Sequence, residues 1–392
     1  MSDPARVVLR DPALDGQLVR TLTAAYEGAA DLGEVYAVAR GLDGASGLGW
    51  WEAWWPLARR TEETAEAALA AGRRASARAA FLRASEYHRQ SYIFIRSNLA
   101  DQRLLDAHAA HAATFAKAAA LFDTPAEQVR IPYEGTTLNA WWFAPDDSGA
   151  PRPTLLLPCG YDTAAESDWG LMQVPAALAR GYNALRFEGP GQGEALYRQR
   201  LPFRPDFEAV LTPVVDWTLA RGDVRPDGLV LVGRSFAGYL APRGATGEPR
   251  LAALVCDPAQ PDMGAKIPTG LAGRIAGPVV DAQARLKAAR REFFGARAAS
   301  HGVDTPSAYL RDLRRYTMIA DAGRITCPTL AVEAEGDFAG GGGQALVDAV
   351  GGPGTVLRLT AAEGAGGHCG GLGQQVWAQK VFDWLAGVVP GD

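Results

Sequence analysis

The sequence has few cysteines and no long apolar run. Its four cysteines, Cys159, Cys256, Cys327 and Cys369, are scattered and match neither a metal-binding nor a disulfide spacing, which is typical of a protein of the reducing cytosol. No apolar stretch is long enough to span a bilayer, and the N-terminus lacks the apolar core of a secretory signal. We therefore expect a cytoplasmic protein without a membrane partner.

Basic charge is neither in excess nor clustered. The chain has 39 Lys and Arg against 44 Asp and Glu, a net charge of −5, and shows no basic tract or basic helix face. A nucleic-acid partner is therefore not expected. A hydrophobic content of 48% and a charged content of 21% are typical of a globular protein, and 392 residues are enough for two domains.

The first third of the chain has a helical pattern. The stretch from Thr61 to Arg96 contains no proline and is rich in helix formers. Two stripes at helical spacing are Ala77, Phe81, Ala84, His88, Ser91 and Ile95, and then Leu104, His108, His111, Phe115 and Phe122. Because Pro125 breaks the pattern, we predict an N-terminal helical cap domain over residues 1–124.

From residue 125 onward, strands alternate with helices. A β-hairpin is predicted to turn near Glu134 and Gly135, and six apolar runs follow: TLLLPCG, YNALRFEGP, GLVLVGRS, LAALVCDPA, PTLAVEAEGD and TVLRLTAAEG. This alternation predicts an α/β domain over 125–392 with a mostly parallel sheet and helices on both faces. The β pattern lapses over 262–321, where we expect a helical lid insertion above the carboxyl ends of the strands.

The sequence Gly233-Arg234-Ser235-Phe236-Ala237 fits a nucleophile elbow, Gly-x-Ser-x-Gly, with alanine in the last small position. Small residues on either side of the serine let the helix pack close to the strand. The backbone N–H of Phe236 then points toward a developing oxyanion. These residues alone do not separate a nucleophile elbow from a strand-to-helix turn that has only a structural role.

A serine nucleophile needs a histidine base that follows it in the chain. His88, His108 and His111 precede the sheet on helix faces and are expected to be packing residues. A metal site at His108 and His111 lacks a third ligand. His301 lies in the inserted helical region. His368, in EGAGGHCG after the last predicted strand, is therefore the candidate base.

The orienting acid is expected after the strand in PTLAVEAEGDF, which offers Glu333, Glu335 and Asp337. Asp337 follows a glycine in a turn where its carboxylate can face the His368 loop, and Glu335 is the reserve candidate. The acid fixes the histidine tautomer and stabilises the imidazolium. A second oxyanion donor is expected after the first parallel strand, from the backbone N–H of Tyr161. No cofactor or metal is expected.

Four stretches together resemble one α/β-hydrolase family. They are PCGYDTAAESDW (158–169), FEGPGQGE (187–194), GRSFAG at the elbow and EGAGGHC around the histidine. The family includes 2,6-dihydroxypseudooxynicotine hydrolase and the fungal hydrolases that shorten polyketide pigment precursors. Members usually have aspartate where this chain has Glu188 and commonly glycine where it has Ala237. The resemblance extends over most of the chain from about residue 30 and includes the helical N-terminal segment.

The resemblance implies Ser235 as nucleophile, Asp337 as acid and His368 as base, and it implies a homodimer. It also implies hydrolysis of a C–C bond beside a ketone, or of an ester, in a small aromatic or polyketide-like metabolite. The alternatives are an acyltransferase or cyclase with the same triad, and a non-catalytic binding protein on the same scaffold. Seven tryptophans are expected mainly in packing, with an aromatic pocket as the alternative: Trp50, Trp51, Trp54, Trp55, Trp141, Trp142 and Trp169.

Overall fold

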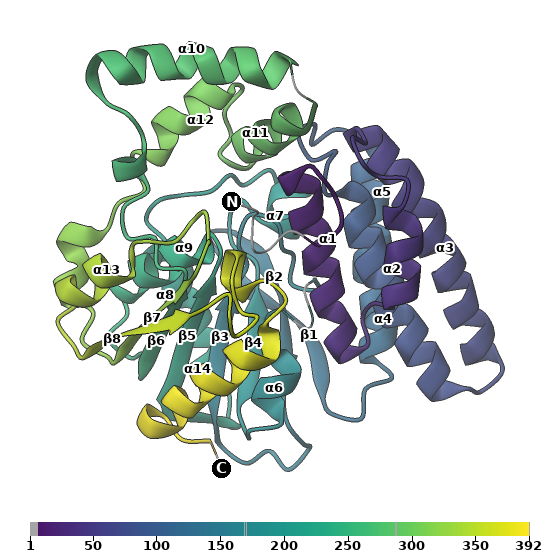
Figure 1. The fold of residues 1–392 in the computed structure, drawn as a ribbon. Coiled ribbons are helices and arrows are strands. Elements are labelled where there is room, and N and C mark those ends of the chain that lie inside the picture. Colours follow the sequence, from purple (N-terminus) through teal and green to yellow (C-terminus); the bar gives the residue numbers. More distant parts are fainter. Residues whose placement is uncertain (1–6, 168, 170, 287, 392) are drawn as a thin grey trace. The chain divides into compact units, whose positions relative to one another are not determined.

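The computed structural model describes residues 7–167, 169, 171–286 and 288–391 (Figure 1). Their contacts group the chain into two compact units. The first comprises Met1–Asp123, Glu166–Leu171 and Pro268–Arg311, and the second comprises Thr124–Ala165, Met172–Ile267 and Asp312–Asp392. Most of the predicted insertion is thus grouped with the N-terminal helices. The domain limits drawn along the sequence, and a lid role for residues 262–321, stay predictions.

Three stretches interpreted above include residues outside this description. They are the start of the N-terminus, with residues 1–6, the stretch 158–169, with Asp168, and the predicted insertion 262–321, with Lys287.

The first unit is built from helices. Before the sheet begins they are α1 (Pro12–Ala24), α2 (Leu32–Ala39), α3 (Gly47–Ala70), α4 (Arg74–Tyr92) and α5 (Gln102–Ala119), with the 3₁₀ turn η1 (Ala25–Glu27) after α1. Four of them begin after a side chain that accepts a backbone N–H of the first turn: Asp11, Asp31, Ser46 and Asp101. These caps satisfy amide groups that the helix itself leaves unpaired.

The helical pattern from Thr61 to Arg96 does not form one continuous helix, and residues 93–96 lie beyond the last helix of that stretch, which ends at Tyr92. Helix α3 ends at Ala70, and α4 begins at Arg74. Between them Gly72 has φ +70°, a left-handed conformation that glycine adopts without steric cost. The two helices therefore pack against each other as a hairpin, and both predicted stripes are largely buried.

The predicted insertion contains four elements. They are η2 (Gly264–Lys266), α10 (Gly270–Leu286), α11 (Ala288–Ser300) and α12 (Pro306–Leu313). Within the first unit, α11 contacts α1 and α3. The Ser97 hydroxyl also donates a 2.7 Å hydrogen bond to Glu292 of α11. Burial raises the pKa of that carboxyl.

The second unit is organised around one eight-stranded sheet with the order β1-β2-β4-β3-β5-β6-β7-β8. The strands are β1 (Ala126–Tyr133), β2 (Thr136–Phe143), β3 (Arg152–Pro158), β4 (Asn183–Phe187), β5 (Val224–Arg234), β6 (Ala253–Asp257), β7 (Thr329–Ala334) and β8 (Gly354–Leu359). Strand β2 pairs antiparallel with β1 and β4, and the remaining neighbours are parallel. The predicted hairpin, the six predicted strands and the mostly parallel sheet are confirmed.

Helices surround this sheet. They are α6 (Val174–Leu178), α7 (Gly193–Tyr197), α8 (Glu208–Leu219), α9 (Ala237–Ala245), α13 (Gly343–Ala349) and α14 (Gln374–Val388), with 3₁₀ turns η3 (Ile319–Arg324) and η4 (His368–Gly370). Figure 1 shows α6 and α14 in front of the sheet and α8 and α9 behind it. Because both faces are covered, strands β3 to β6 are buried along most of their length. Among the described residues, we find no helix both long and apolar enough to cross a lipid bilayer.

Candidate active site

Ser235 lies on a sharp turn between β5 and α9. Its φ is +58°, an uncommon conformation for a residue with a side chain, and its backbone N–H donates to the Asp257 carbonyl at 2.7 Å. A Cβ at Gly233 would lie 2.1 Å from the carbonyl oxygen of Ala237. Only glycine therefore allows the strand and the helix to approach this closely, as the elbow pattern predicts.

The side chains of Ser235, His368 and Asp337 form a continuous hydrogen-bonded chain. His368 Nε2 is 2.9 Å from Ser235 Oγ, and His368 Nδ1 is 2.8 Å from Asp337 Oδ1. The three residues follow the carboxyl ends of β5, β8 and β7 in that order. Because these strands run parallel in one sheet, residues far apart in the sequence meet at a single edge.

Asp337 is held as a carboxylate. Burial acts to raise its pKa, but hydrogen bonds from His368 and from the backbone N–H groups of Ala339 and Cys369 outweigh burial and lower it. The reserve candidate, Glu335, makes a different contact, since its carboxylate accepts the backbone N–H of Ala361 at 2.8 Å. The structure therefore brings Asp337, and not Glu335, to the histidine.

The imidazole of His368 is partly open, with 29% of its side chain exposed. Burial of the ring acts to lower its pKa, whereas the neighbouring Cys369 and the hydrogen bond with Asp337 raise it, and the result lies well above the ordinary value. A ring that bonds a carboxylate at Nδ1 and a hydroxyl at Nε2 can accept a proton from that hydroxyl.

The loop after β3 approaches the elbow. A Cβ at Gly160 would lie 3.5 Å from the backbone nitrogen of Phe236, and the rings of Tyr161 and Phe236 have centroids 4.0 Å apart. Both residues named as oxyanion donors are thus next to Ser235. Phe236 precedes the first turn of α9, where backbone N–H groups point outward from the helix.

The FEGPGQGE motif holds this loop in place. The Glu188 carboxylate is fully buried and accepts the backbone N–H groups of Ala165 at 3.0 Å and Glu194 at 2.7 Å. The amide of Gln192 donates to the Cys159 carbonyl at 2.5 Å. The Glu188 carboxylate therefore links the loop after β3 to the motif.

The other histidines have packing partners in the first unit. His88 Nε2 is 3.1 Å from Glu62, His111 Nδ1 is 2.8 Å from the Ser85 hydroxyl, and His301 packs edge-on against Tyr309. His108 lies edge-on to Tyr92. His88, His108 and His111 thus pack as their place on helix faces predicts, and His301 lies in the turn after α11.

One group of three potential metal ligands occurs among the described residues: Asp337, His368 and Cys369. Both ring nitrogens of His368 already contact Asp337 and Ser235. A metal ion at this position would have to displace one of those contacts.

Most of the tryptophans serve packing. Trp50 and Trp54 are fully buried in the first unit, where they contact Phe94 and Tyr87, and Trp169 packs on Phe115. Rings that the sequence did not single out surround the elbow instead. Phe203 and Tyr316 contact the Phe236 ring, with centroids 4.9 and 5.7 Å away. No motif marks either residue, because each comes from a different connecting segment.

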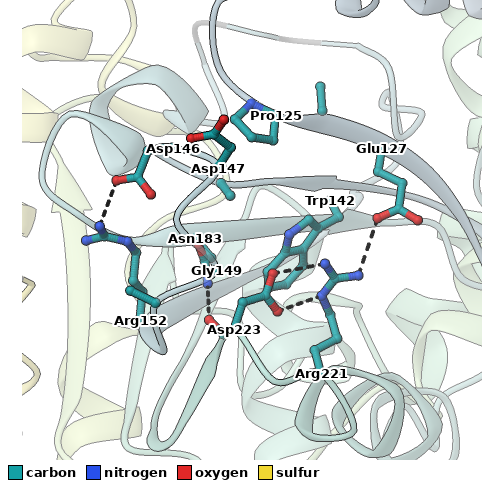
Figure 2. A pocket seen from close by; sticks show the side chains of 13 residues that line it. Pro125, Glu127, Trp142, Asp146, Asp147, Gly149, Arg152, Asn183, Arg221 and Asp223 are labelled. Carbon is teal, nitrogen blue, oxygen red and sulfur yellow. Dashed lines mark hydrogen bonds and ion pairs between the residues drawn. The ribbon is translucent and has the colours of Figure 1, made fainter.

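A surface pocket of about 330 Å³ lies at the opposite edge of the sheet (Figure 2). It is lined by Arg152 and Asn183, which begin β3 and β4, and by Asp223, which precedes β5. Arg221 stacks over Trp142 and pairs with Asp223. Because Ser235 follows the other end of β5, this pocket is separate from the candidate active site.

Comparisons with known proteins agree with the fold. No family model matches the chain. The "Hydrolase acrC" of Aspergillus aculeatus is 31% identical over 409 residues, covering 94% of this chain and 95% of the relative. The "Hydrolyase poxO" of Penicillium oxalicum is 33% identical over 344 residues, covering 80% of each. The crystal structure of 2,6-dihydroxy-pseudo-oxynicotine hydrolase matches with a TM-score of 0.74 at 20% identity, covering 95% of each chain.

The fold and the arrangement at the strand ends define an α/β-hydrolase. The relatives add the closer assignment: this chain belongs to the α/β-hydrolase family of the fungal hydrolases named above. The resemblance stated from the four sequence stretches is thereby confirmed.

Proposed function

We propose that this chain is a serine hydrolase that cleaves a C–C bond beside a ketone, or an ester, in a small aromatic or polyketide-like metabolite. The observation that carries the proposal is the position of the His368 ring, with Nε2 2.9 Å from Ser235 Oγ and Nδ1 2.8 Å from Asp337. Such an arrangement activates a hydroxyl that is otherwise a poor nucleophile.

In the first step, Ser235 Oγ attacks the substrate carbonyl carbon while its proton moves to His368 Nε2. Asp337 stabilises the imidazolium through Nδ1. The negative charge that develops on the carbonyl oxygen is accepted by the backbone N–H groups of Phe236 and Tyr161. Donors fixed in advance at such a position lower the barrier because they need no reorganisation during the reaction.

In the second step, the tetrahedral intermediate collapses and the bond to the leaving group breaks. The electron pair leaves on carbon as an enolate, or on oxygen for an ester, and takes the proton from His368. His368 then removes a proton from water, which attacks the acyl-enzyme. Collapse of the second intermediate releases a carboxylic acid and returns the proton to Ser235.

The surroundings of Ser235 support an aromatic or β-keto substrate. The rings of Tyr161, Phe203 and Phe236 contact one another beside the expected oxyanion donors. Flat apolar groups bind well against such surfaces. The name of the structural neighbour, 2,6-dihydroxy-pseudo-oxynicotine hydrolase, is consistent with an aromatic ketone.

The test combines covalent labelling with a substrate panel. A fluorophosphonate probe is expected to modify Ser235, as located by mass spectrometry of the digested protein. The Ser235→Ala variant is expected to lose labelling and more than about 10³-fold of turnover. Ser148→Ala, in an exposed turn, is the matched control and should retain both. Aryl β-diketones and esters would then be compared as substrates.

The outcomes separate the alternatives. Release of a free acid that contains one oxygen from ¹⁸O-labelled water supports hydrolysis. Transfer of the acyl group to a second substrate without such incorporation would point to the acyltransferase or cyclase. Wild-type protein that binds these ketones but leaves Ser235 unlabelled would overturn the proposal in favour of a binding protein.

A further inference from the structure

A buried arginine directly precedes the candidate nucleophile. Arg234 is the last residue of β5, and only 2% of its side chain is exposed. A guanidinium group is always charged, so its burial is unfavourable unless every side of it has a partner. The partners of this group therefore indicate what it does.

The guanidinium reaches three different segments. It donates from Nε to Asp257 Oδ2 at 2.9 Å, from Nη2 to the Cys369 carbonyl at 2.7 Å and from Nη1 to Gln374 Oε1 at 3.0 Å. Its Cζ also lies 4.2 Å from the centroid of the Trp377 ring in α14. Arg234 thus joins the end of β6, the residue after His368 and the start of α14.

The segment around His368 bonds within itself at Gly370 and Gly371, whose backbone N–H groups donate to the Gly367 and His368 carbonyls at 3.1 and 3.0 Å. It is rich in glycine, and Cys369 has a φ of +52°, which is uncommon for a residue with a side chain. The carbonyl of Cys369 accepts from Arg234 at 2.7 Å and from the Gln374 side chain at 3.0 Å. Gln374 also donates to the Gly371 carbonyl at 2.7 Å. Arg234 and Gln374 therefore fix the backbone next to the base, together with Asp337, whose Oδ2 accepts the Cys369 N–H at 3.0 Å.

Asp257 matters because it is a second buried carboxylate near the site. It is fully buried, and burial raises its pKa while the charge of Arg234 opposes that rise. The charged or titratable groups around His368 are therefore Asp337, Cys369, Asp257 and Arg234. Arg234 bonds Oδ2 of Asp257 at 2.9 Å, and Asp337 is the carboxylate that bonds the ring.

We propose that Arg234 is a positioning residue, which holds the His368 loop through the Cys369 carbonyl so that Nε2 stays within hydrogen-bond distance of Ser235. This inference rests on the proposed function, because it assigns Arg234 a part in the activation of Ser235. Arg234 does not touch the reacting atoms itself; it acts through the backbone of the residue next to the base.

The experiment measures fluorophosphonate labelling of the full chain as kinact and KI. The first variant is Arg234→Lys, which keeps the charge but cannot bond three segments at once. The second is the double variant Arg234→Met with Asp257→Leu. It removes both buried charges together, and apolar replacements of a buried ion pair often leave stability unchanged. Gln374→Met removes the second support of the Cys369 carbonyl.

Both Arg234 variants are expected to lower kinact about 10²-fold, since a displacement of about 1 Å at a reacting group has that effect. KI should stay within about twofold, because probe binding does not use this loop. Gln374→Met should lower kinact in the same direction by a smaller factor. The control, Arg243→Met with Glu208→Leu, removes an ion pair that joins α9 to α8 and should leave kinact unchanged.

Wild-type kinact in a folded double variant, as judged by circular dichroism, would overturn the inference. The inference would also be overturned if KI rose by as large a factor as kinact falls. It would likewise be overturned if kinact fell equally in the control variant. If the double variant does not fold, Arg234→Lys and Gln374→Met decide in the same way. Failure of the unchanged protein to label at Ser235 would instead overturn the proposed function and this inference with it.

Discussion

The ring of Phe338 lies against the imidazole of His368, with centroids 4.6 Å apart and planes inclined by 35°. Phe338 directly follows Asp337, and yet 74% of it is exposed to solvent. An aromatic ring in that position limits the orientations of the imidazole and shields one of its faces from water.

We therefore expect Phe338→Ala to slow fluorophosphonate labelling by several-fold to about tenfold, since positioning of the base is part of its effect. Stability should change by no more than about 0.5 kcal/mol because the side chain is exposed. Labelling rates and thermal unfolding of the variant measure the two effects. Phe338→Leu, which keeps an apolar cover, is the control and should be closer to wild type. Equal rates in all three proteins would show that the contact has no part in the chemistry.

The two acidic residues after β7 are expected to behave differently. Asp337→Asn removes the charge that stabilises the imidazolium and should lower turnover by about 10³- to 10⁴-fold. Glu335→Gln changes only a contact with the backbone of Ala361 and should have little effect on rate. Turnover of a reactive aryl ester by both variants provides the measurement. The reverse order would move the acid to Glu335.

The pH dependence follows from the raised pKa of His368. The ring must be unprotonated at Nε2 to accept the serine proton, so the labelling rate falls as pH drops through that pKa. Burial acts against the rise, but Cys369 and Asp337 raise the pKa well above the ordinary value of 6.5. The acid limb of the labelling rate should therefore lie above pH 6.5.

The Asp337→Asn variant lacks one of the groups that raise the pKa of His368. Its acid limb should therefore move to lower pH, and its maximum labelling rate should fall. Labelling rates measured in buffers from acid to alkaline pH test both statements. An acid limb at the same pH in both proteins would mean that Asp337 does not interact with the titrating group.

Close packing at the elbow predicts an effect on stability. A Cβ at Gly233 would meet the Ala237 carbonyl oxygen at 2.1 Å and the Ala241 methyl at 2.5 Å. Gly233→Ala should therefore lower the free energy of unfolding by about 1–3 kcal/mol. Gly222→Ala has open space around its new methyl group and serves as the control. Urea unfolding of both variants measures the difference; similar midpoints would contradict the close approach.

The sequence predicts the sheet and the hydrogen-bonded side chains of Ser235, Asp337 and His368 because each depends on a local pattern. Apolar runs mark the strands, and parallel strands place their carboxyl ends at one edge. The turn in Glu335-Gly336-Asp337 favours Asp337 over Glu335 before any coordinates are known. The helix break at Gly72 was also visible in principle, since Ala71-Gly72 is a common helix end.

Other features could not be predicted because they depend on which strands become neighbours. Arg234 and Asp257 end strands that are adjacent in the sheet, and nothing in either stretch alone indicates that pairing. The same holds for Phe203 and Tyr316, which reach the elbow from unrelated segments. A charged residue that closely follows the apolar run Leu229–Val232 is the one signal that could have marked Arg234.

The grouping of residues 268–311 with residues 1–123 has a consequence for anyone who dissects or recombines this protein. Truncation just before β1 would not release an autonomous hydrolase, because α11 would lose its contacts with α1 and α3 and Glu292 would lose Ser97. In a chimaera with a relative, residues 1–123 and 268–311 should therefore be exchanged together.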